Sequence, residues 1–559
     1  MKRTIAIGIQ NYNEIIEKNC FYIDKTLFIK EWWESMDSVT LITRPRRFGK
    51  TLNMSMVEQF FSVNYAGRND LFERQAIWQE EKFRNLQGNW PVISLSFSDV
   101  KASSFDQARN KICFLIQMLY KKYDFLMEDN LLDDREKEAF RRVSPDMEDY
   151  EAAFSIKLLS DYLYRYYKKK VIILLDEYDT PMQEAYVDGY WDKMIDFIRS
   201  LFNSTFKSNP WLERAILTGI TRISKESVFS DLNNLEIVTT TSNKYATSFG
   251  FTEKEVFEAM DEYGYSNKGE IKEWYDGFVF GKERDIYNPW SILNFLSKGV
   301  LDTYWANTSS NQLVSKLVRE GSPHIKMTME DLLHNKPLRT QIDEQIVFNQ
   351  LNHKTSAIWS LLLASGYLKV VNYTRSPRKG KPDYELALTN MEVRFLFEDM
   401  INGWFADFTP AYNQFIEALL LRDVKAMNSY MNRVALQTFS YFDTGNRPSE
   451  KEPERFYHGF VLGLIVELEG RYTVTSNRES GFGRYDVVLE PLKKDNYAYI
   501  LEFKVHDSEK EETLNDTVAA ALAQIADKKY ETALLAKGIP ADKIQKYGFA
   551  FEGQTVLIG

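Results

Sequence analysis

Two short groups of residues have the types and spacing needed to handle a phosphate group with a bound metal ion. The first, Gly49-Lys50-Thr51, stands between an apolar run (Leu41, Ile42) and an amphipathic run that begins at Leu52. A strand, a loop and a helix are the natural interpretation, and a helix N-terminus offers backbone N–H groups to an anion. The lysine ammonium and the threonine hydroxyl would add contacts to phosphate oxygens and Mg²⁺, as in a Walker A loop.

The match to the Walker A pattern is incomplete at its start. The pattern has glycine where this chain has Arg44, and Pro45 removes a further N–H donor. Average composition gives a chance Gly-Lys-Ser/Thr in roughly one chain in four of this length, so other residues must decide. The residues that we expect to contact the nucleotide in this loop are Arg47, Phe48, Gly49, Lys50, Thr51 and Leu52.

The second group is an apolar run that ends in two acids. Residues 171–175 predict a strand buried on both faces, and Asp176 and Glu177 follow it. At the carboxyl end of that strand, Asp176 would hold Mg²⁺ together with Thr51, and Glu177 would polarise the water that attacks the γ-phosphate. The simpler alternative is that the acids cap the next helix. Together the two groups favour binding of ATP with Mg²⁺.

A third apolar run, residues 214–220, predicts another strand of the same sheet. Thr218 and Arg222 lie at its end, where a polar side chain could sense the γ-phosphate. Arg46, Arg47 or Arg222 could act on the chain's own nucleotide or on that of a neighbouring subunit. The second case requires a homo-oligomer, which the sequence leaves open.

Another set of acids and a lysine lies near the end of the chain. Asp486 precedes one apolar run, and Glu502 and Lys504 alternate with the apolar residues of the next. Period-two alternation puts Glu502 and Lys504 on one face of a predicted hairpin, which is costly unless they face a site. If the hairpin aligns Asp486 with Glu502, the two carboxylates hold Mg²⁺ while Lys504 positions a water or neutralises charge as a phosphodiester is cut.

This spacing is the PD-(D/E)xK nuclease pattern. A helix predicted over residues 514–530 brings Gln524, an auxiliary residue in such folds, and Glu479 is a candidate further acid. The alternative is an exposed hairpin whose glutamate and lysine form a cross-strand pair. We favour the nuclease-like site because its residues occur in the expected order with the expected elements between them.

The elements that position these residues belong to a chain of 559 residues, which is more than one hydrophobic core usually serves. Alternating strands and helices predict an α/β P-loop domain with a parallel sheet. The predicted regions are a lead-in packed on the ATPase (1–37), a P-loop AAA-like ATPase domain (38–250), a helical lid (251–325), a helical, winged-helix-like region (326–450) and a restriction-endonuclease-like α/β domain (451–559).

Local signals support the lid and the region after it. Thr252 and Glu255 form a capping-box pattern that predicts a helix start. The lid's aromatic groups could stack an adenine, but we favour a role in its core. Further on, a helix (358–364) and a hairpin with a basic tip (375–382) predict a winged helix. That tip could contact a phosphate backbone or form a solvated turn.

Composition limits the function classes. With 70 basic and 80 acidic residues the formal net charge is −10, which excludes a globally basic coat, so nucleic acid must be contacted through local basic patches. Two cysteines, Cys20 and Cys113, cannot form a disulfide framework and suit a reducing cytoplasm. The N-terminal apolar run is too short for a secretory signal, and the longest apolar runs fall short of the ~20 residues that span a bilayer. We expect a cytoplasmic protein without membrane contact.

Nearly end to end, the chain resembles bacterial proteins with an N-terminal AAA-ATPase-like domain and a C-terminal PD-(D/E)xK nuclease-like domain. The residues that carry the resemblance are Tyr22 to Thr26, Arg44 to Thr51, Asp176 to Pro181, Trp274 to Gly277, Tyr287 to Trp290, and Ser476 to Asp486 with Glu502 and Lys504. The loop from Arg44 looks like that family's own variant of Walker A, so the missing glycine is expected. The resemblance implies ATP binding and a nuclease fold.

Two functions follow as hypotheses. In the first, the chain is an ATP-dependent or ATP-gated deoxyribonuclease with ATP and Mg²⁺ as cofactors. In the second, it is a nucleotide switch: ATP rearranges the lid and the winged helix, and the C-terminal domain only binds nucleic acid or a partner protein. The net charge of −10 and the few basic residues near Asp486 favour the second somewhat. The sequence leaves DNA and RNA both open.

Overall fold

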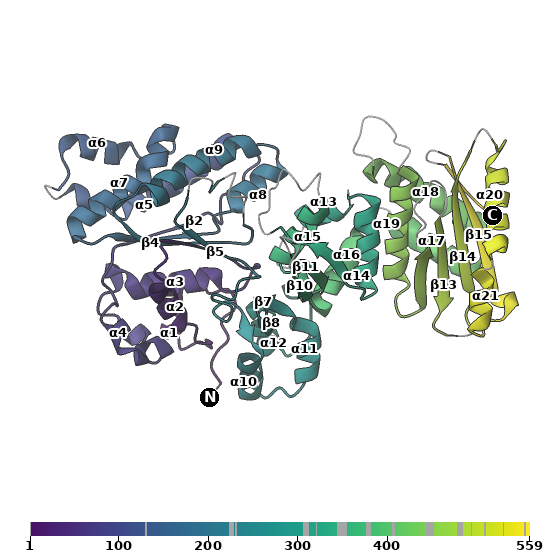
Figure 1. Ribbon diagram of the computed structural model, residues 1–559, viewed down its shortest axis with the longest axis horizontal. Helices are drawn as coiled ribbons and strands as arrows, with labels where there is room; N and C mark the ends of the chain where they lie inside the picture. The colour runs from purple at the N-terminus through teal and green to yellow at the C-terminus, as the bar shows by residue number, and fades with distance from the viewer. Residues whose placement is uncertain are drawn as a thin grey trace. The chain divides into compact units, whose positions relative to one another are not determined.

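The computed structural model forms two compact units, each with its own sheet structure (Figure 1). Unit 1 consists of Met1–Ser309 and Pro337–Val393, and unit 2 of Ser310–Lys336 and Arg394–Gly559. The residues that the structure describes are 2–559 without 129–130, 223–227, 230–231, 306–311, 320, 344–354, 376–381, 405–408, 443–451, 478–484, 494, 508–509, 529 and 553–554.

A five-stranded parallel sheet in the order β2-β3-β4-β1-β5 forms the centre of unit 1 and confirms the predicted α/β class. Its strands are β1 (Val39–Thr43), β2 (Val92–Ser96), β3 (Val171–Asp176), β4 (Leu212–Gly219) and β5 (Leu235–Val238). Every residue of β1 and β3 is buried, because helices cover both faces of the sheet. The order places β4 between β1 and β3. Because these three strands are parallel, their carboxyl ends lie at the same edge of the sheet.

The helices of this region lie in two layers (Figure 1). They are α1 (Tyr12–Glu17), α2 (Leu27–Ser35), α3 (Lys50–Phe61), α4 (Glu81–Arg84), α5 (Phe105–Lys121), α6 (Asp134–Arg142), α7 (Asp149–Tyr167), α8 (Thr180–Val187) and α9 (Trp191–Phe202). The helices α5, α7 and α9 cover one face of the sheet, and α1, α2 and α3 lie on the other.

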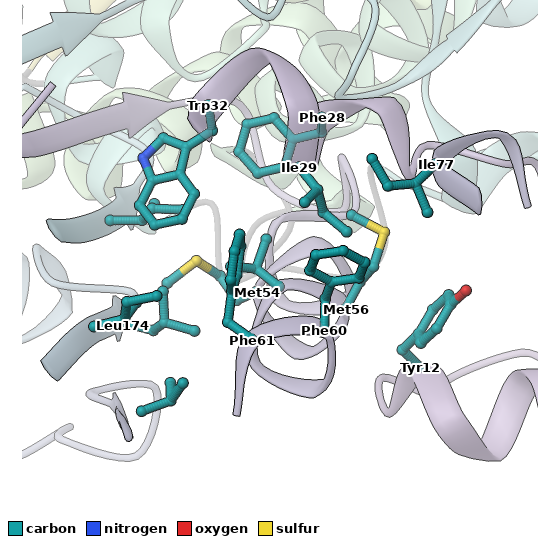
Figure 2. Packing of buried hydrophobic residues seen from close by; sticks show 14 of the residues in the cluster. Tyr12, Phe28, Ile29, Trp32, Met54, Met56, Phe60, Phe61, Ile77 and Leu174 are labelled. Atoms are coloured by element: carbon teal, nitrogen blue, oxygen red, sulfur yellow. The ribbon is translucent and has the colours of Figure 1, made fainter. Parts of the chain in front are cut away.

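The N-terminal segment packs on this second face, as its aromatic composition predicts. Trp32 of α2, Phe60 and Phe61 of α3, and Tyr12 of α1 share one hydrophobic cluster with Leu174 of β3 (Figure 2). Trp32 and Tyr12 are fully buried. The lead-in therefore belongs to the core that supports α3, the helix that follows the Gly-Lys-Thr loop.

Two smaller parts complete unit 1. The first holds a sheet in the order β6-β8-β7 and begins at the predicted capping box, in which Glu255 N–H donates to Thr252 Oγ1 and Thr252 N–H to Glu255 Oε2. Its elements are β6 (Phe251–Thr252), α10 (Glu253–Tyr263), α11 (Lys268–Tyr275), β7 (Phe278–Phe280), β8 (Glu283–Tyr287) and α12 (Pro289–Lys298). We call residues 251–305 the lid.

The second part contains the predicted helix and hairpin. Its elements are β9 (Leu338–Gln341), α15 (Thr355–Ala364), β10 (Leu368–Thr374) and β11 (Asp383–Leu388), with the strands in the order β10-β11-β9. We call residues 337–393 the wing segment. The basic tip of the hairpin, 376–381, lies outside the described residues. The predicted region 326–450 contributes residues to both units.

Unit 2 is built on a mixed sheet in the order β12-β13-β14-β15-β16, antiparallel except for the pair β14 and β15. Its elements are α13 (Gln312–Arg319), α14 (Pro323–Leu333), α16 (Met391–Trp404), α17 (Thr409–Leu421), α18 (Val424–Phe442), α19 (Glu452–Glu467), β12 (Tyr472–Asn477), β13 (Tyr485–Pro491), β14 (Ala498–Val505), α20 (Leu514–Lys528), α21 (Tyr530–Ala536), β15 (Ile544–Glu552) and β16 (Thr555–Ile558). The first three residues of α16 belong to unit 1.

Candidate functional sites

The loop between β1 and α3 has the backbone of an anion-binding turn. Gly49 (φ 79°) and Arg47 (φ 65°) both adopt the left-handed conformation, which glycine reaches freely and arginine at some cost. Gly49 is the N-cap of α3, and Lys50 and Thr51 are its first two residues. Leu52 follows them and packs against the core. The predicted strand, loop and helix are therefore confirmed.

Lys50 is buried beneath this loop. Its ammonium group donates to the carbonyl oxygens of Arg44 (3.0 Å) and Pro45 (2.9 Å). Burial lowers the pKa of Lys50, and the nearby carboxylates of Glu177 and Asp176 oppose that shift. The ammonium thus lies within electrostatic reach of both predicted acids, and it contacts carbonyl oxygens that it could exchange for phosphate oxygens.

Asp176, the last residue of β3, is held by two hydroxyl groups. Thr51 Oγ1 donates to Asp176 Oδ2 at 2.6 Å, and Thr218 Oγ1 of β4 donates to Asp176 Oδ1. Thr218 reaches the carboxylate because β4 lies next to β3 in the sheet. The structure therefore brings together three residues from separate segments of the sequence, and oxygen groups of this kind suit Mg²⁺.

Glu177 stands at a strained position beside this group. Its φ of 50° is uncommon for a residue with a side chain, and such strain is often found at functional sites. Burial raises the pKa of Glu177, and the charge of Lys50 opposes that change. A carboxylate with a raised pKa is a better proton acceptor for a water molecule.

Asp179 is a structural residue of the site that we did not predict. Its buried carboxylate accepts hydrogen bonds from Thr221 N (2.8 Å), Thr221 Oγ1 (2.7 Å) and Ile220 N (3.1 Å). The neighbouring Tyr178 donates its hydroxyl proton to Thr221 O at 2.7 Å. These bonds fix the segment after β4 against the segment after β3, so Thr218 keeps its place beside Asp176.

Arg44 occupies the position of the missing glycine and has a structural role. Its side chain is fully buried and donates to Thr43 O (2.9 Å) and Thr239 O (2.7 Å), while its guanidinium carbon lies 4.5 Å from the centre of the Phe280 ring. Burial lowers the pKa of Arg44. Arg44 therefore ties the start of the loop to the end of β5 and to the lid.

The lid holds the loop through backbone and aromatic contacts. The carbonyl oxygen of Arg46 accepts hydrogen bonds from Trp305 Nε1 (3.0 Å) and Asn288 Nδ2 (3.3 Å). The guanidinium group of Arg47 lies over the ring of Trp290, 4.3 Å from its centre. Most other lid aromatics are buried in its own hydrophobic cluster, which agrees with the predicted core role.

The wing segment also contacts the loop. Gly366 (φ 87°), two residues after α15, has so little room that a Cβ atom would lie 2.9 Å from Pro45 Cγ and 2.8 Å from a ring carbon of Phe278. Phe48 packs on Phe278 and Phe280, with ring centres 4.7 and 5.5 Å apart. The loop is thus enclosed by the sheet, the lid and the wing segment.

Arg222 lies elsewhere on the same edge of the sheet. It lines a small cavity of about 20 Å³ together with Thr43, Thr239 and Ser360. The cavity is formed by the ends of β1 and β5 and by α15. We therefore keep the role of Arg222 toward a nucleotide as a prediction.

In unit 2 the register of the hairpin aligns the two predicted acids. Asp486 of β13 pairs directly with Glu502 of β14, and their side chains are 2% and 0% exposed. Paired residues on antiparallel strands point to the same face. The predicted alignment, on which the nuclease-like site depends, is present.

Gln524 and Lys504 complete this arrangement. Gln524 Nε2 of α20 donates to Glu502 Oε1. Lys504 lies two residues after Glu502 on the same strand, hence on the same face, and is partly exposed. On the other side Tyr457 of α19 donates its hydroxyl proton to the carbonyl oxygen of Asp486 at 3.0 Å, which fixes the start of β13. Glu479 lies outside the described residues.

The two sites fit the same kind of cofactor by different means. Two buried carboxylates on one face, with an amide group on one of them, form an oxygen-rich donor set that suits a hard divalent cation. Asp486 and Glu502 would hold such a cation in unit 2, and Thr51 and Asp176 would hold one in unit 1. When bound, Mg²⁺ would neutralise charge on phosphate oxygens and lower the pKa of a water molecule.

Comparison with protein families finds a match in each unit. Residues 6–229 match a family described as predicted AAA-ATPase, and residues 452–559 match the PD-(D/E)XK nuclease superfamily. The chain therefore has the architecture that its resemblance implied, and the two matches point to a nucleotide-dependent domain joined to a nuclease-like domain.

A similar protein covers almost the whole chain. It comes from Azotobacter chroococcum mcd 1 and is described as an uncharacterized protein in the vnfD 5′ region. It is 24% identical over 561 residues, which cover 96% of this chain and 95% of that protein. The similarity therefore extends over both units of this chain.

A helix that crosses a bilayer must be both long and apolar. Among the described residues, none forms a helix that is both long and apolar enough to do so.

Proposed function

We propose that the chain binds and hydrolyses ATP in unit 1 and cleaves a phosphodiester bond of nucleic acid in unit 2. The proposed substrate is DNA. The observation that carries the nuclease part is the register that pairs Asp486 with Glu502. The contacts of Thr51 and Thr218 with Asp176 support the ATPase part.

Each residue then has a defined task. In unit 1, Lys50 and the N–H groups at the start of α3 bind the phosphates, and Glu177 accepts a proton from the attacking water. In unit 2, Gln524 orients Glu502, and Lys504 stabilises the negative charge that develops on the phosphate. The buried positions of Asp486 and Glu502 limit their movement, so the charges stay fixed during the reaction.

The nuclease part is tested with purified full-length chain, DNA or RNA of linear and circular form, and Mg²⁺, with and without ATP. Asp486→Asn and Lys504→Ala should each slow cleavage by about 100-fold or more. Glu490→Gln is the matched control, because Glu490 lies on the same strand and face as Asp486 but pairs with Lys537 at 2.5 Å. Intact nucleic acid under all conditions would contradict the proposal.

A second candidate function is the nucleotide switch, in which unit 2 binds without cutting. One observation supports it. The lid and the wing segment both contact the phosphate-binding loop, so a bound nucleotide would affect both. A phenotype in cells that survives Lys504→Ala and disappears with Lys50→Ala would select this function over cleavage.

A further inference from the structure

The lid carries a group of acids that neither candidate site uses. Glu253 is the first residue of α10, Asp276 directly follows α11, and Asp285 lies in β8. One carboxylate oxygen from each of the three lies within 4.8 Å of the other two. Three elements of the fold therefore bring their negative charges to one point.

Asp276 is the buried member of this group. It is 8% exposed, and its Oδ1 atom accepts no hydrogen bond from any residue that the structure describes. An unsatisfied carboxylate oxygen inside a protein is costly, and a cation beside it would remove that cost.

The cations already present do not fill this position. Lys272 pairs with Glu253 and lies 3.3 Å from Asp285, but it stays 3.7 Å from Asp276 Oδ2 and its side chain is 44% exposed. Lys369 of β10 is close enough to Asp276 and Asp285 to feel their charge, while burial lowers its pKa. Arg284 donates to the carbonyl oxygen of Val371 at 3.2 Å.

The spacing of the oxygens limits the size of an ion that all three could share. Two oxygens that each lie about 2.3–2.6 Å from one Ca²⁺ are at most about 4.6–5.2 Å apart, whereas Mg²⁺, at about 2.0–2.1 Å, draws them within about 4.2 Å. The three oxygens lie within 4.8 Å of one another, so they can reach one divalent cation of the size of Ca²⁺, and a smaller one where they approach more closely.

We propose that Glu253, Asp276 and Asp285 form a binding site for a divalent cation, for which Ca²⁺ is the probe, separate from both candidate catalytic sites. The ion displaces the exposed ammonium group of Lys272 and takes the buried oxygen of Asp276 as a ligand. The hydroxyl group of Tyr287, which donates to Glu253 Oε2 at 3.2 Å, orients that carboxylate.

The test is calorimetric titration of the chelator-treated full-length chain with CaCl₂. Asp276→Asn and the more exposed Asp285→Asn should each remove one bound Ca²⁺ or weaken its binding by about tenfold or more. Asp261→Asn is the control, because Asp261 is an exposed acid of α10 that pairs with Lys268 at 2.8 Å. Asp176→Asn and Asp486→Asn should leave this Ca²⁺ in place.

Lys272→Met separates a cation site from an ordinary group of ion pairs. Without the competing ammonium group, Ca²⁺ should bind several-fold more tightly than to the natural chain. Identical titrations of the natural chain and Asp285→Asn would overturn the proposal, and so would a Lys272→Met chain that binds Ca²⁺ no more tightly. Tyrosine-sensitised terbium emission, expected from Tyr287, gives a second readout that needs no enzymatic activity.

Discussion

In unit 1, Asp176 ends a parallel strand and accepts hydrogen bonds from hydroxyl groups of α3 and β4. In unit 2, Asp486 and Glu502 lie opposite each other on antiparallel strands joined by a short connection. The first site is assembled from segments far apart in the sequence, and the second mainly from one hairpin. The first site is also enclosed by the lid and the wing segment.

This difference determines how each site responds to change. The register of the hairpin places both acids at once, and a slip of one strand by one residue would turn its acid to the opposite face of the sheet. The unit 1 site depends on several separate contacts, each of which can fail alone. Substitutions remote from Asp176 should therefore affect unit 1 in graded steps, whereas the site of unit 2 should depend on few residues.

The largest expected effect is that of Lys50→Ala. Loss of the ammonium group removes a charge that faces the phosphates, so ATP hydrolysis, measured as phosphate release, should fall by about 100-fold or more. Lys82→Ala is the matched control, because the Lys82 side chain is 71% exposed and its ion pair with Glu34 is long, at 3.8 Å. If the Lys50→Ala chain hydrolysed ATP at the natural rate, the assignment of Lys50 to the phosphate-binding site of unit 1 would be wrong.

Arg44→Met should have the next largest effect. It leaves the carbonyl groups of Thr43 and Thr239 buried without their donor, so the unfolding free energy of unit 1 should fall by about 2–4 kcal/mol in chemical denaturation. Arg141→Met on the exposed surface of α6 should be nearly neutral. Equal stability of the two variants would show that Arg44 does not anchor the loop.

Thr218→Val should have a smaller effect, because only one hydrogen bond is lost and the shape is kept. The oxygen of Asp176 that accepts from Thr218 keeps the Glu177 N–H as a donor at 3.0 Å but loses the hydroxyl group, which should cost about 1–3 kcal/mol of unfolding free energy and also lower the rate of ATP hydrolysis. The same change at the exposed Thr473 of β12 serves as control. A neutral Thr218→Val would mean that β4 does not help to place Asp176.

The smallest effect concerns the pH dependence of unit 2. Burial, together with a hydrogen bond to Glu469, raises the pKa of Glu398 to about 7. The folded chain then holds a proton that the unfolded chain releases near pH 4.5, so stability should fall as the pH rises from about 4.5 to about 7.

Glu398→Gln should flatten this dependence. The expected difference is about 1 kcal/mol, because the two carboxyl groups share the proton and Arg394 lies 2.8 Å from both. The measurement is the unfolding free energy across this pH range. Glu417→Gln, at an exposed position of α17, is the control and should keep the natural slope; an unchanged slope in Glu398→Gln would contradict the prediction.

The sequence was sufficient where one local pattern determines the position of a residue. The continuous apolar run before Asp176 predicts a buried strand that ends at the acid, and the alternation around Glu502 predicts the face that it shares with Lys504. The capping box at Thr252 is equally local. These predictions need no knowledge of which elements become neighbours.

The remaining features depend on neighbours that the sequence does not reveal. Asp179 matters because β4 lies between β1 and β3, and Arg44 is buried because the lid and β5 close over it. The acids Glu253, Asp276 and Asp285 meet only when three lid elements pack together. The division of residues 326–450 between the two units follows from tertiary contacts as well.

The close approach of Pro45 and Gly366 has a consequence for how such a protein can diverge. The two positions are far apart along the chain, yet a single added methyl group at Gly366 would occupy the space of the proline ring. Gly366 can therefore acquire a side chain only if its neighbours make room, and a smaller residue at position 45 is one way to do so. We expect related chains with a larger residue at position 366 to carry a compensating change at position 45, and a lone replacement of Gly366 to be lost from the lineage.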